Sequence, residues 1–389
     1  MTKVSAFAPA TIANVGPGFD CLGLAINGIG DVVKAELTSE FAGVRLVGIV
    51  NNPGLPFGPE NVVEAVGNEV YAAYLNVNPG KEVGIELTLH KNMGIGTGMG
   101  SSASSSVAAA MAVNKILGMY TGIRGGLYTE TPEGLVHRET REYVRASSGL
   151  DSSGFFKRDS RVMIDAVVEG EYVACGSRHA DNVLPSLLGG LILIYDTKKF
   201  EYMRFEVPDS IYLAVVQPDL RVDTKDAREA LKVPYDLGEL VRVSGMCLKS
   251  WAENNFGDYD ISDIAKILKP GGSENVVLRY LDGAHDVLYG LINADADLLG
   301  GGVMTDRIIT PKRGELITGY KEVAKAFLEG GALGCSISGS GSAMFAVADS
   351  VKNATNAGLM AQKTWKGLGI ESKMYVSRVN NTGATVQLF

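Results

Sequence analysis

The sequence predicts an α+β protein of two domains. Segments with helical and strand periodicity mix along the chain without the regular βαβ rhythm of a doubly wound sheet. A chain of 389 residues is long enough for two domains. A polar stretch at 197–206 follows a buried strand, so we predict one domain over residues 1–198 and a second over residues 199–389.

The first half contains alternating strands, helices and turns. Strands are expected at 3–8, 22–37, 43–50, 83–90 and 191–196, and helices at 61–75, 101–116, 161–176 and 183–190. The segment ATIANVGPGFD (10–20) is expected to be a loop. Residues 119–160 are rich in turn formers and charge, and we interpret them as an excursion from the fold.

The second half continues the mixed pattern. Strands are expected at 211–216 and 343–348 and in the last two segments, MYVSRV and ATVQLF, and helices at 224–232, 282–293 and 320–329. Residues 236–280 are interpreted as a second excursion.

Composition argues against several classes of protein. The net charge is −8 and there is no long basic block, which disfavours nucleic acid and anionic membranes as partners. No apolar run approaches 18 residues and the N-terminus lacks a signal-peptide core, so we expect a cytoplasmic enzyme. The four cysteines are far apart and lack metal-ligand spacing, so they are expected to be reduced and packed.

A glycine-rich segment, KNMGIGTGMGSSASSSVAAA (91–110), is the clearest candidate for a binding site. Glycine permits positive φ and close backbone approach, and the helix that follows presents free N–H groups and a positive dipole end. These features predict a phosphate cradle formed by Gly96, Gly98, Met99, Gly100, Ser101 and Ser102. The spacing is neither that of a P-loop nor that of a dinucleotide fingerprint. The alternative is a tight strand-to-helix turn that binds nothing.

Three motifs occur in the order PATIANVGPGFDCLGLAI (9–26), GIGTGMGSSAS (94–104) and GALGCSISGSGSAMF (331–345). In this order they resemble the GHMP kinase superfamily. The segments RHADNVLPSLLGG (178–190), PDLRVDTKDAREAL (218–231) and PKRGELITGYKEV (311–323) add a resemblance to the homoserine kinase family within it. The chain departs from the family pattern at Gly94, Met99 and Ser342, where proline, leucine and proline are usual.

The resemblance implies an N-terminal half like domain 2 of ribosomal protein S5 that binds ATP, and a ferredoxin-like C-terminal half. It implies transfer of phosphate from ATP to the hydroxyl of L-homoserine, giving O-phosphohomoserine for threonine synthesis. The third motif is expected to pack beneath the glycine loop. Homodimers are common among such kinases.

For ATP and Mg²⁺ we expect five side chains to matter, and for Glu171 and Asn61 the expectation comes from the resemblance. Glu171 is expected to hold the metal, with Glu169 as competitor, and an exposed helix glutamate is the alternative. Ser101 or Ser102 would offer a hydroxyl to Mg²⁺ or phosphate, with Ser102 the expected metal ligand, and one of the two could be only an N-cap. Lys91 is expected to face phosphate or solvent. Asn61 is expected to contact the nucleotide or to cap a helix.

For the amino-acid substrate the resemblance implies six residues. Asn14 and Asp20 would hold the amino and hydroxyl end, Arg228 and Arg313 would clamp the carboxylate, and His179 and Asn182 would border the hydroxyl. The alternatives are turn formation for Asn14 and Asp20, surface exposure for the arginines and a structural role for His179. Glu171, Asn182, His179 and Arg228 form the expected catalytic set.

No general base stands out in these segments. The resemblance implies that the hydroxyl proton passes to phosphate. Mevalonate- and galactose-type relatives use an aspartate instead, and Asp151 in SSGLD (147–151) is the rival candidate, with a simple turn as the alternative. Another small-alcohol kinase and a non-catalytic nucleotide-binding protein are the competing functions.

Overall fold

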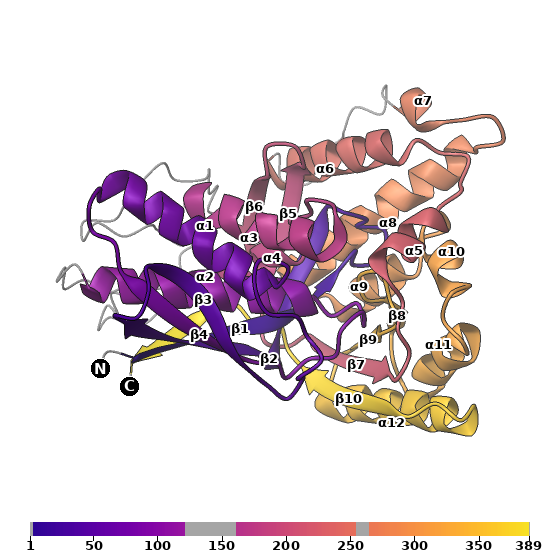
Figure 1. The fold of residues 1–389 in the computed structure, drawn as a ribbon. Helices are drawn as coiled ribbons and strands as arrows, with labels where there is room; N and C mark the ends of the chain where they lie inside the picture. Colours follow the sequence, from indigo (N-terminus) through magenta and orange to yellow (C-terminus); the bar gives the residue numbers. More distant parts are fainter. Residues whose placement is uncertain (1–2, 121–160, 254–263, 389) are drawn as a thin grey trace.

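The protein is built on two β-sheets covered by helices (Figure 1), in a computed structural model that describes residues 3–120, 161–253 and 264–388. The first sheet has seven strands in the order β11-β1-β2-β4-β3, with β5 paired to β2 and β6 paired to β5. Its strands are β1 (Lys3–Ala13), β2 (Leu22–Thr38), β3 (Gly43–Val50), β4 (Gly84–His90), β5 (Leu191–Asp196), β6 (Glu201–Phe205) and β11 (Thr385–Leu388). β3 and β4 run parallel, whereas the other pairs of this sheet are antiparallel.

Three helices pack on the first sheet: α1 (Val62–Val77), α2 (Ser101–Tyr120) and α4 (Val183–Leu188). A fourth, α3 (Arg161–Cys175), packs on these helices. α2 lies at the centre of this layer, against both β1 and β2 and beneath α1 and α3. Its run of small residues is buried throughout, from Ala103 to Ala112. Small side chains let the helix and the sheet approach closely, so the segment beside the glycine loop is anchored in the core.

The second sheet has the order β10-β7-β9-β8. Its strands are β7 (Tyr212–Pro218), β8 (Gly334–Ile337), β9 (Met344–Ala348) and β10 (Ser372–Ser377), and all its pairs are antiparallel. Numbered within this half, the order is 4-1-3-2, with helices between the first two and the last two strands. This is the ferredoxin-like arrangement that the resemblance implied.

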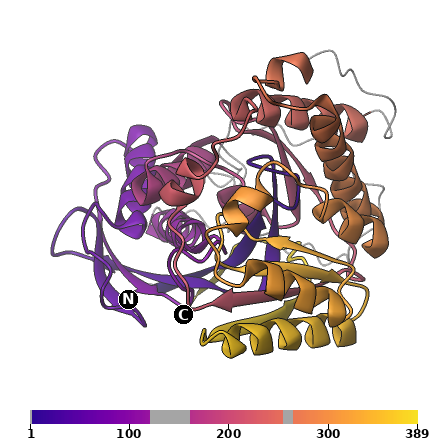
Figure 2. The same ribbon diagram turned by 90° about the vertical axis from the view of Figure 1, so that its right-hand side faces the viewer.

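The helices of the second half are α5 (Thr224–Glu229), α6 (Leu237–Glu253), α7 (Ile264–Ile267), α8 (Glu274–Asn293), α9 (Ala296–Val303), α10 (Thr310–Gly314), α11 (Tyr320–Glu329) and α12 (Val351–Gly367). Successive side chains of β7 point to opposite faces of the second sheet. Ala214 and Val216 join the core under α11 and α12, whereas Leu213 and Val215 join the core with α6, α8 and α9. Figure 2 shows the yellow α12 along one side of this sheet.

The structure corrects several expected elements. β1 runs on to Ala13, because Thr11, Ile12 and Ala13 pair with β2. The segment 236–280 is no excursion in its described part: α6 and the start of α8 bury Leu240, Leu248 and other apolar residues in the core. The expected helix at 282–293 therefore begins earlier. β6, β8, α7, α9, α10 and α12 were not predicted.

The two sheets do not divide the chain at a single point. Residues 198 and 199 lie in the turn of the β5–β6 hairpin, and both strands belong to the first sheet. β11 returns from the second half to pair with β1, which brings the two ends of the chain side by side (Figure 1). A boundary after residue 198 stays a prediction. In the described ranges, each helix is too short or too polar to span a bilayer.

Candidate active site

The glycine loop joins β4 to α2 and has the backbone shape of a cradle. Gly96, Gly98 and Gly100 have φ of 66°, 76° and 64°, a region that residues with a side chain rarely adopt. A Cβ atom at Gly98 would overlap the carbonyl oxygen of Ser338, and one at Gly100 would overlap the Thr11 hydroxyl. The sequence therefore needs glycine at these positions for both conformation and space.

The third glycine motif packs beneath this loop, as the resemblance implied. Ser338 donates to the carbonyl oxygen of Gly98 at 2.7 Å, and the amide of Ala343 donates to the carbonyl oxygen of Thr97 at 2.9 Å. Two loops that lie more than two hundred residues apart thus hold each other in shape, which keeps the cradle's conformation independent of a ligand.

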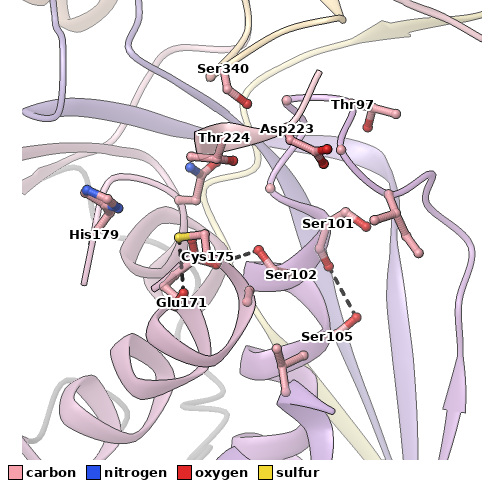
Figure 3. Close-up of a pocket in the computed structure, with 18 of the residues that line it drawn as sticks. Thr97, Ser101, Ser102, Ser105, Glu171, Cys175, His179, Asp223, Thr224 and Ser340 are labelled. Atoms are coloured by element: carbon pink, nitrogen blue, oxygen red, sulfur yellow. Dashed lines mark hydrogen bonds between the residues drawn. The ribbon is translucent and has the colours of Figure 1, made fainter. Parts of the chain in front are cut away.

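A cavity of about 610 Å³ opens over the glycine loop and continues toward α5 and α10. Every predicted site residue lies in the described part of the chain, and all of them except Met99 line this cavity. The lining residues among them are Asn14, Asp20, Asn61, Lys91, Gly96, Gly98, Gly100, Ser101, Ser102, Glu171, His179, Asn182, Arg228 and Arg313. Met99 does not line it, because its side chain is buried in the hydrophobic core. Residues from both halves of the chain meet in this cavity (Figure 3).

The first turn of α2 contacts α3 at the wall of the cavity. Ser102 donates a hydrogen bond of 2.6 Å to Oε1 of Glu171 (Figure 3). Glu171 is 7% exposed, and burial raises the pKa of its carboxyl, while the hydrogen bond from Ser102 lowers it. Glu169 pairs instead with Arg178, away from Ser102. A carboxylate and a hydroxyl side by side are hard oxygen donors of the kind that Mg²⁺ accepts.

Ser101 has a different place in the same turn. Its side-chain oxygen is buried at the cavity and makes no hydrogen bond to any described residue. A buried hydroxyl without a partner is uncommon, because it loses its hydrogen bonds to water. Ser101 therefore has donor and acceptor capacity available for a ligand.

Lys91 was expected to face phosphate or solvent. It is buried and so does not face solvent, and although it lines the cavity its ammonium group is engaged by other residues. Its ammonium group forms an ion pair with Asp31 and donates to the carbonyl oxygen of Ser101 at 2.8 Å and to Oγ of Ser105 at 2.9 Å. An ammonium group has three protons, so these contacts use them all. Burial lowers the Lys91 pKa and the Asp31 carboxylate opposes that effect. Lys91 braces the start of α2 from within.

Asn61 also has a structural role. Its side-chain oxygen accepts from the amide of Val63 at 3.0 Å, as an N-cap of α1, and its side-chain nitrogen donates to Pro56 at 2.8 Å. Both ends of its amide are therefore in use. The side-chain nitrogen carries a second N–H, so Asn61 can shape the loop at the cavity's edge and still offer a donor to a nucleotide, and that contact stays a prediction.

The opposite end of the cavity is rich in charge. Asn14 and Asp20 both have φ of 54°, a strained conformation for side-chain-bearing residues, and Asn14 accepts from the amide of Asp20 at 2.8 Å. Arg228 donates to Asp20 at 2.8 Å and contacts His179. Arg313 is 3% exposed and donates to the carbonyl oxygen of Gly339 at 2.7 Å. Arg313 is therefore no surface residue, whereas the Arg228 side chain is 35% exposed.

Asn182 lines the cavity beside the glycine loop, where its side-chain oxygen comes within 2.9 Å of the place a Cβ atom at Gly100 would take. Its side-chain oxygen accepts from the Thr11 hydroxyl at 2.7 Å, which leaves its amide nitrogen as the group available to the cavity. His179 is partly buried, and this burial together with Arg228 and Arg313 lowers its pKa, against the effect of Asp20. The imidazole is therefore biased toward its neutral form.

Sequence reasoning missed Asp181. This carboxylate is 3% exposed and lies on the cavity wall within the HADN segment. Burial and the nearby carboxylates of Asp20 and Glu171 raise its pKa to about 7. No described residue hydrogen-bonds to it, so a ligand cation is its natural partner. The signal was present in the sequence, since Asp181 is the only acidic residue of that segment.

Arg221 was missed as well. Its side chain lies against Gly96 at the mouth of the cradle, and the amide of the next residue, Val222, donates to the carbonyl oxygen of Gly96 at 3.1 Å. Its guanidinium donates to Asp223 at 2.7 Å. Since the protons of Lys91 are in use, Arg221 brings an exposed positive charge to this end of the cavity. Asp151, the rival base, lies outside the described residues.

Comparison with known proteins agrees with this geometry. Residues 62–153 match the family model of the GHMP kinases N terminal domain, and residues 287–367 match that of the GHMP kinases C terminal domain. A homoserine kinase of Chlorobium phaeobacteroides is 31% identical over 99% of this chain and 100% of its own. The homoserine kinase of Arabidopsis thaliana is 30% identical over 98% of this chain and 84% of its own.

Solved structures show the same relationship. The crystal structure of homoserine kinase from Cytophaga hutchinsonii has a TM-score of 0.72 and 31% identity, covering 99% of this chain and 97% of that one. Lactococcus lactis galactokinase has a TM-score of 0.60 at 14% identity, covering 98% of this chain and 95% of that one, and shares the fold. The chain therefore belongs to the homoserine kinase family of the GHMP kinases.

Proposed function

We propose that this protein transfers the γ-phosphoryl group of ATP to the side-chain hydroxyl of L-homoserine. The observation that carries the proposal is the single cavity that joins the glycine loop and the Ser102–Glu171 pair at one end to Arg228, Arg313 and Asp181 at the other. One end suits a triphosphate and the other suits a zwitterionic amino acid.

The triphosphate end works through the backbone. The amides of the glycine loop and the start of α2 present N–H groups and the positive end of a 20-residue helix to the phosphates. Ser101 adds its unpartnered hydroxyl and Arg221 its guanidinium. Most of the catalysis in phosphoryl transfer comes from such positioning and charge stabilisation rather than from covalent chemistry by the protein.

Ser102 and Glu171 are the residues that would hold Mg²⁺. In the described part of the chain no group of three or more His, Cys, Asp or Glu side chains could hold a metal ion, so the protein would supply two oxygens and leave the remaining positions to phosphate and water. When bound, the metal supplies charge neutralisation on the phosphate oxygens. The two side chains fix its place at the start of α2.

The amino-acid end recognises both charges of the substrate. Arg228 and Arg313 can bind a carboxylate, since planar guanidinium forks match its two oxygens. Asp181 can accept from the ammonium group, and its ionised form is then the binding form. Asn182 lines the cavity beside the glycine loop, and its amide nitrogen can donate to the substrate hydroxyl oxygen, holding it for attack.

In the reaction, the homoserine oxygen forms a bond to the γ-phosphorus while the bond from that phosphorus to the β–γ bridging oxygen breaks. ADP leaves with the electron pair, and the hydroxyl proton passes to an oxygen of the transferred group. The products are ADP and O-phosphohomoserine.

An assay of ADP release, coupled to a second enzyme, tests the proposal with homoserine, mevalonate, galactose and shikimate as acceptors. We expect turnover with homoserine and kcat/KM at least about 100-fold lower with the others, since they lack the carboxylate and ammonium pair in this arrangement. A preference for any of the other three alcohols would overturn the choice of substrate. Nucleotide binding without turnover of any of them would favour a non-catalytic role.

A further inference from the structure

Phe19 joins the two arginines of the cavity. Its side chain is buried in the loop between β1 and β2. The guanidinium carbon of Arg228 lies 5.7 Å from the centre of the Phe19 ring, and that of Arg313 lies 5.0 Å from it. Both distances are within the range of a cation–π interaction. The arginines come from α5 and α10, so three distant segments meet at one ring.

Two guanidinium groups so close to one ring repel each other, and burial strengthens the repulsion. Arg228 offsets its charge with Asp20. Arg313 forms no ion pair with a described residue. Burial and Arg228 lower its pKa, although the carboxylates of Asp20, Asp181 and Asp306 raise it. Its one hydrogen bond goes to the carbonyl oxygen of Gly339, and its Nε is buried without a partner. The negative face of the Phe19 ring is therefore part of what makes a buried cation at Arg313 tolerable.

The backbone of Phe19 is held in place by a residue of α8. Its backbone amide donates to the hydroxyl of Tyr280 at 3.0 Å, and Tyr280 is fully buried in α8. Asp20, the next residue, holds Arg228. The ring and the carboxylate that act on the arginines are thus neighbours in the chain, and α8 anchors both.

We infer that Phe19 is a positioning residue that holds Arg228 and Arg313 in one geometry for a substrate carboxylate. The inference rests on the proposed function for the identity of that substrate. It assigns Phe19 a role beyond packing, because an aliphatic side chain of similar volume could fill the space but could not attract the two cations.

Graded fluorination of the ring separates these roles. Phe19 is replaced by 4-fluorophenylalanine and by 3,4,5-trifluorophenylalanine, which weaken the negative face of the ring at nearly constant shape. We expect KM for homoserine to rise stepwise, by about tenfold at the trifluoro ring. KM for ATP should stay within about twofold of the unmodified value, since the arginines serve the other substrate.

Two controls sharpen the result. Phe200 lies 5.6 Å from the guanidinium carbon of Arg161 and does not line the 610 Å³ cavity, so fluorination there tests the same chemistry on a different cation. The second control is 3-aminopropan-1-ol, an acceptor that lacks the carboxylate. Its kcat/KM should be low with the unmodified enzyme and should not change with fluorination at Phe19.

The outcomes distinguish this inference from the proposed function. A homoserine KM that ignores fluorination, or one that moves together with KM for ATP, would overturn the role of Phe19 and leave homoserine phosphorylation intact. If the unmodified protein does not turn over homoserine, the proposed function fails. The inference is then judged by thermal unfolding without substrate, where the midpoint must fall stepwise with fluorination at Phe19 and fall less at Phe200. A flat series overturns it.

Discussion

Ser102 and Glu171 meet at 2.6 Å, and this hydrogen bond ties the first turn of α2 to α3 beside the glycine loop. The contact places a carboxylate at the helix end where phosphate is expected. Repulsion between the two anions would be severe without a cation between them. The pair therefore makes sense as a metal-holding unit.

Glu171→Gln should lower kcat on the order of 100-fold, because an amide cannot replace a carboxylate as a metal ligand. The half-saturating Mg²⁺ concentration should rise as well. Steady-state kinetics over a Mg²⁺ titration measures both quantities. Glu169→Gln is the matched control, since Glu169 lies on the same helix but pairs with Arg178, and it should behave like the unmodified enzyme. Equal kinetics for the two variants would remove Glu171 from the site.

Lys91→Met should destabilise the fold by about 3 to 5 kcal/mol, because it leaves the buried Asp31 carboxylate without its cation. Urea unfolding measures the change. The double variant Lys91→Met with Asp31→Asn should recover part of that loss. If Lys91→Met kept full stability and only raised KM for ATP, Lys91 would be a phosphate ligand after all.

Asp181→Asn should change the pH dependence of stability. The Asp181 pKa is raised to about 7, whereas an unfolded aspartate titrates near 3.9. Between these two values the folded protein keeps a proton that the unfolded chain has lost, so the free energy of unfolding falls as pH rises, by about 1 kcal/mol per pH unit. The variant lacks this fall. Urea unfolding at several values from pH 4 to pH 8 compares the two proteins.

Ionisation of Asp181 should also affect the pH dependence of kcat/KM. Because the ionised Asp181 binds the ammonium group, kcat/KM for homoserine should rise through about pH 7 in the unmodified enzyme. Asp181→Asn should lower kcat/KM and remove this inflection. A profile that keeps the inflection in the variant would assign it to another group.

Arg313→Lys should raise KM for homoserine about 10- to 100-fold and leave KM for ATP unchanged, because a single ammonium cannot form the two parallel hydrogen bonds of a guanidinium. Initial rates with each substrate varied in turn separate the two constants. Arg178→Lys provides the comparison, since Arg178 does not line the 610 Å³ cavity. A KM for homoserine that responds equally to both changes would count against a carboxylate clamp at Arg313.

Gly98→Ala should abolish ATP binding and destabilise the fold, since the added methyl group would overlap the carbonyl oxygen of Ser338. Gly176→Ala tests the contribution of strain alone: Gly176 has a similar φ of 73° with open space around it. It should cost about 1 kcal/mol and leave ATP binding intact. Isothermal titration with ATP and urea unfolding measure the two effects, and equal losses in both variants would exclude a specific role for the loop.

Local patterns predicted much of the fold. The alternation at 83–90 and the helical spacing at 61–75 correspond to β4 and α1 within about two residues. The helix α12 was missed because its mean hydropathy is low and only one face, with Ala357, Ala361 and Trp365, is buried. α6 was missed although Leu240, Val243 and Trp251 lie on one side of it, since the polar residues between them concealed the period.

The candidate site, like the fold, could be predicted only in part from the sequence. The glycine positions could be inferred because a phosphate cradle has characteristic sequence surroundings. The family resemblance pointed to Ser102 and Glu171, which the structure brings together, and their roles as metal ligands stay predictions. The direction in which a side chain points could not be inferred from the sequence. Lys91 could have reached phosphate from the end of β4, but Asp31 on β2 captured its ammonium group.

The sequence by itself determined that this chain has a glycine cradle followed by a helix, and it determined the set of charged residues available for a zwitterionic substrate. Only the tertiary structure decided which of those charges face the cavity and which neutralise one another. The reason is physical: a buried charge must find a partner, and its partners here, Asp31 for Lys91 and Asp20 for Arg228, come from distant segments that folding brings together.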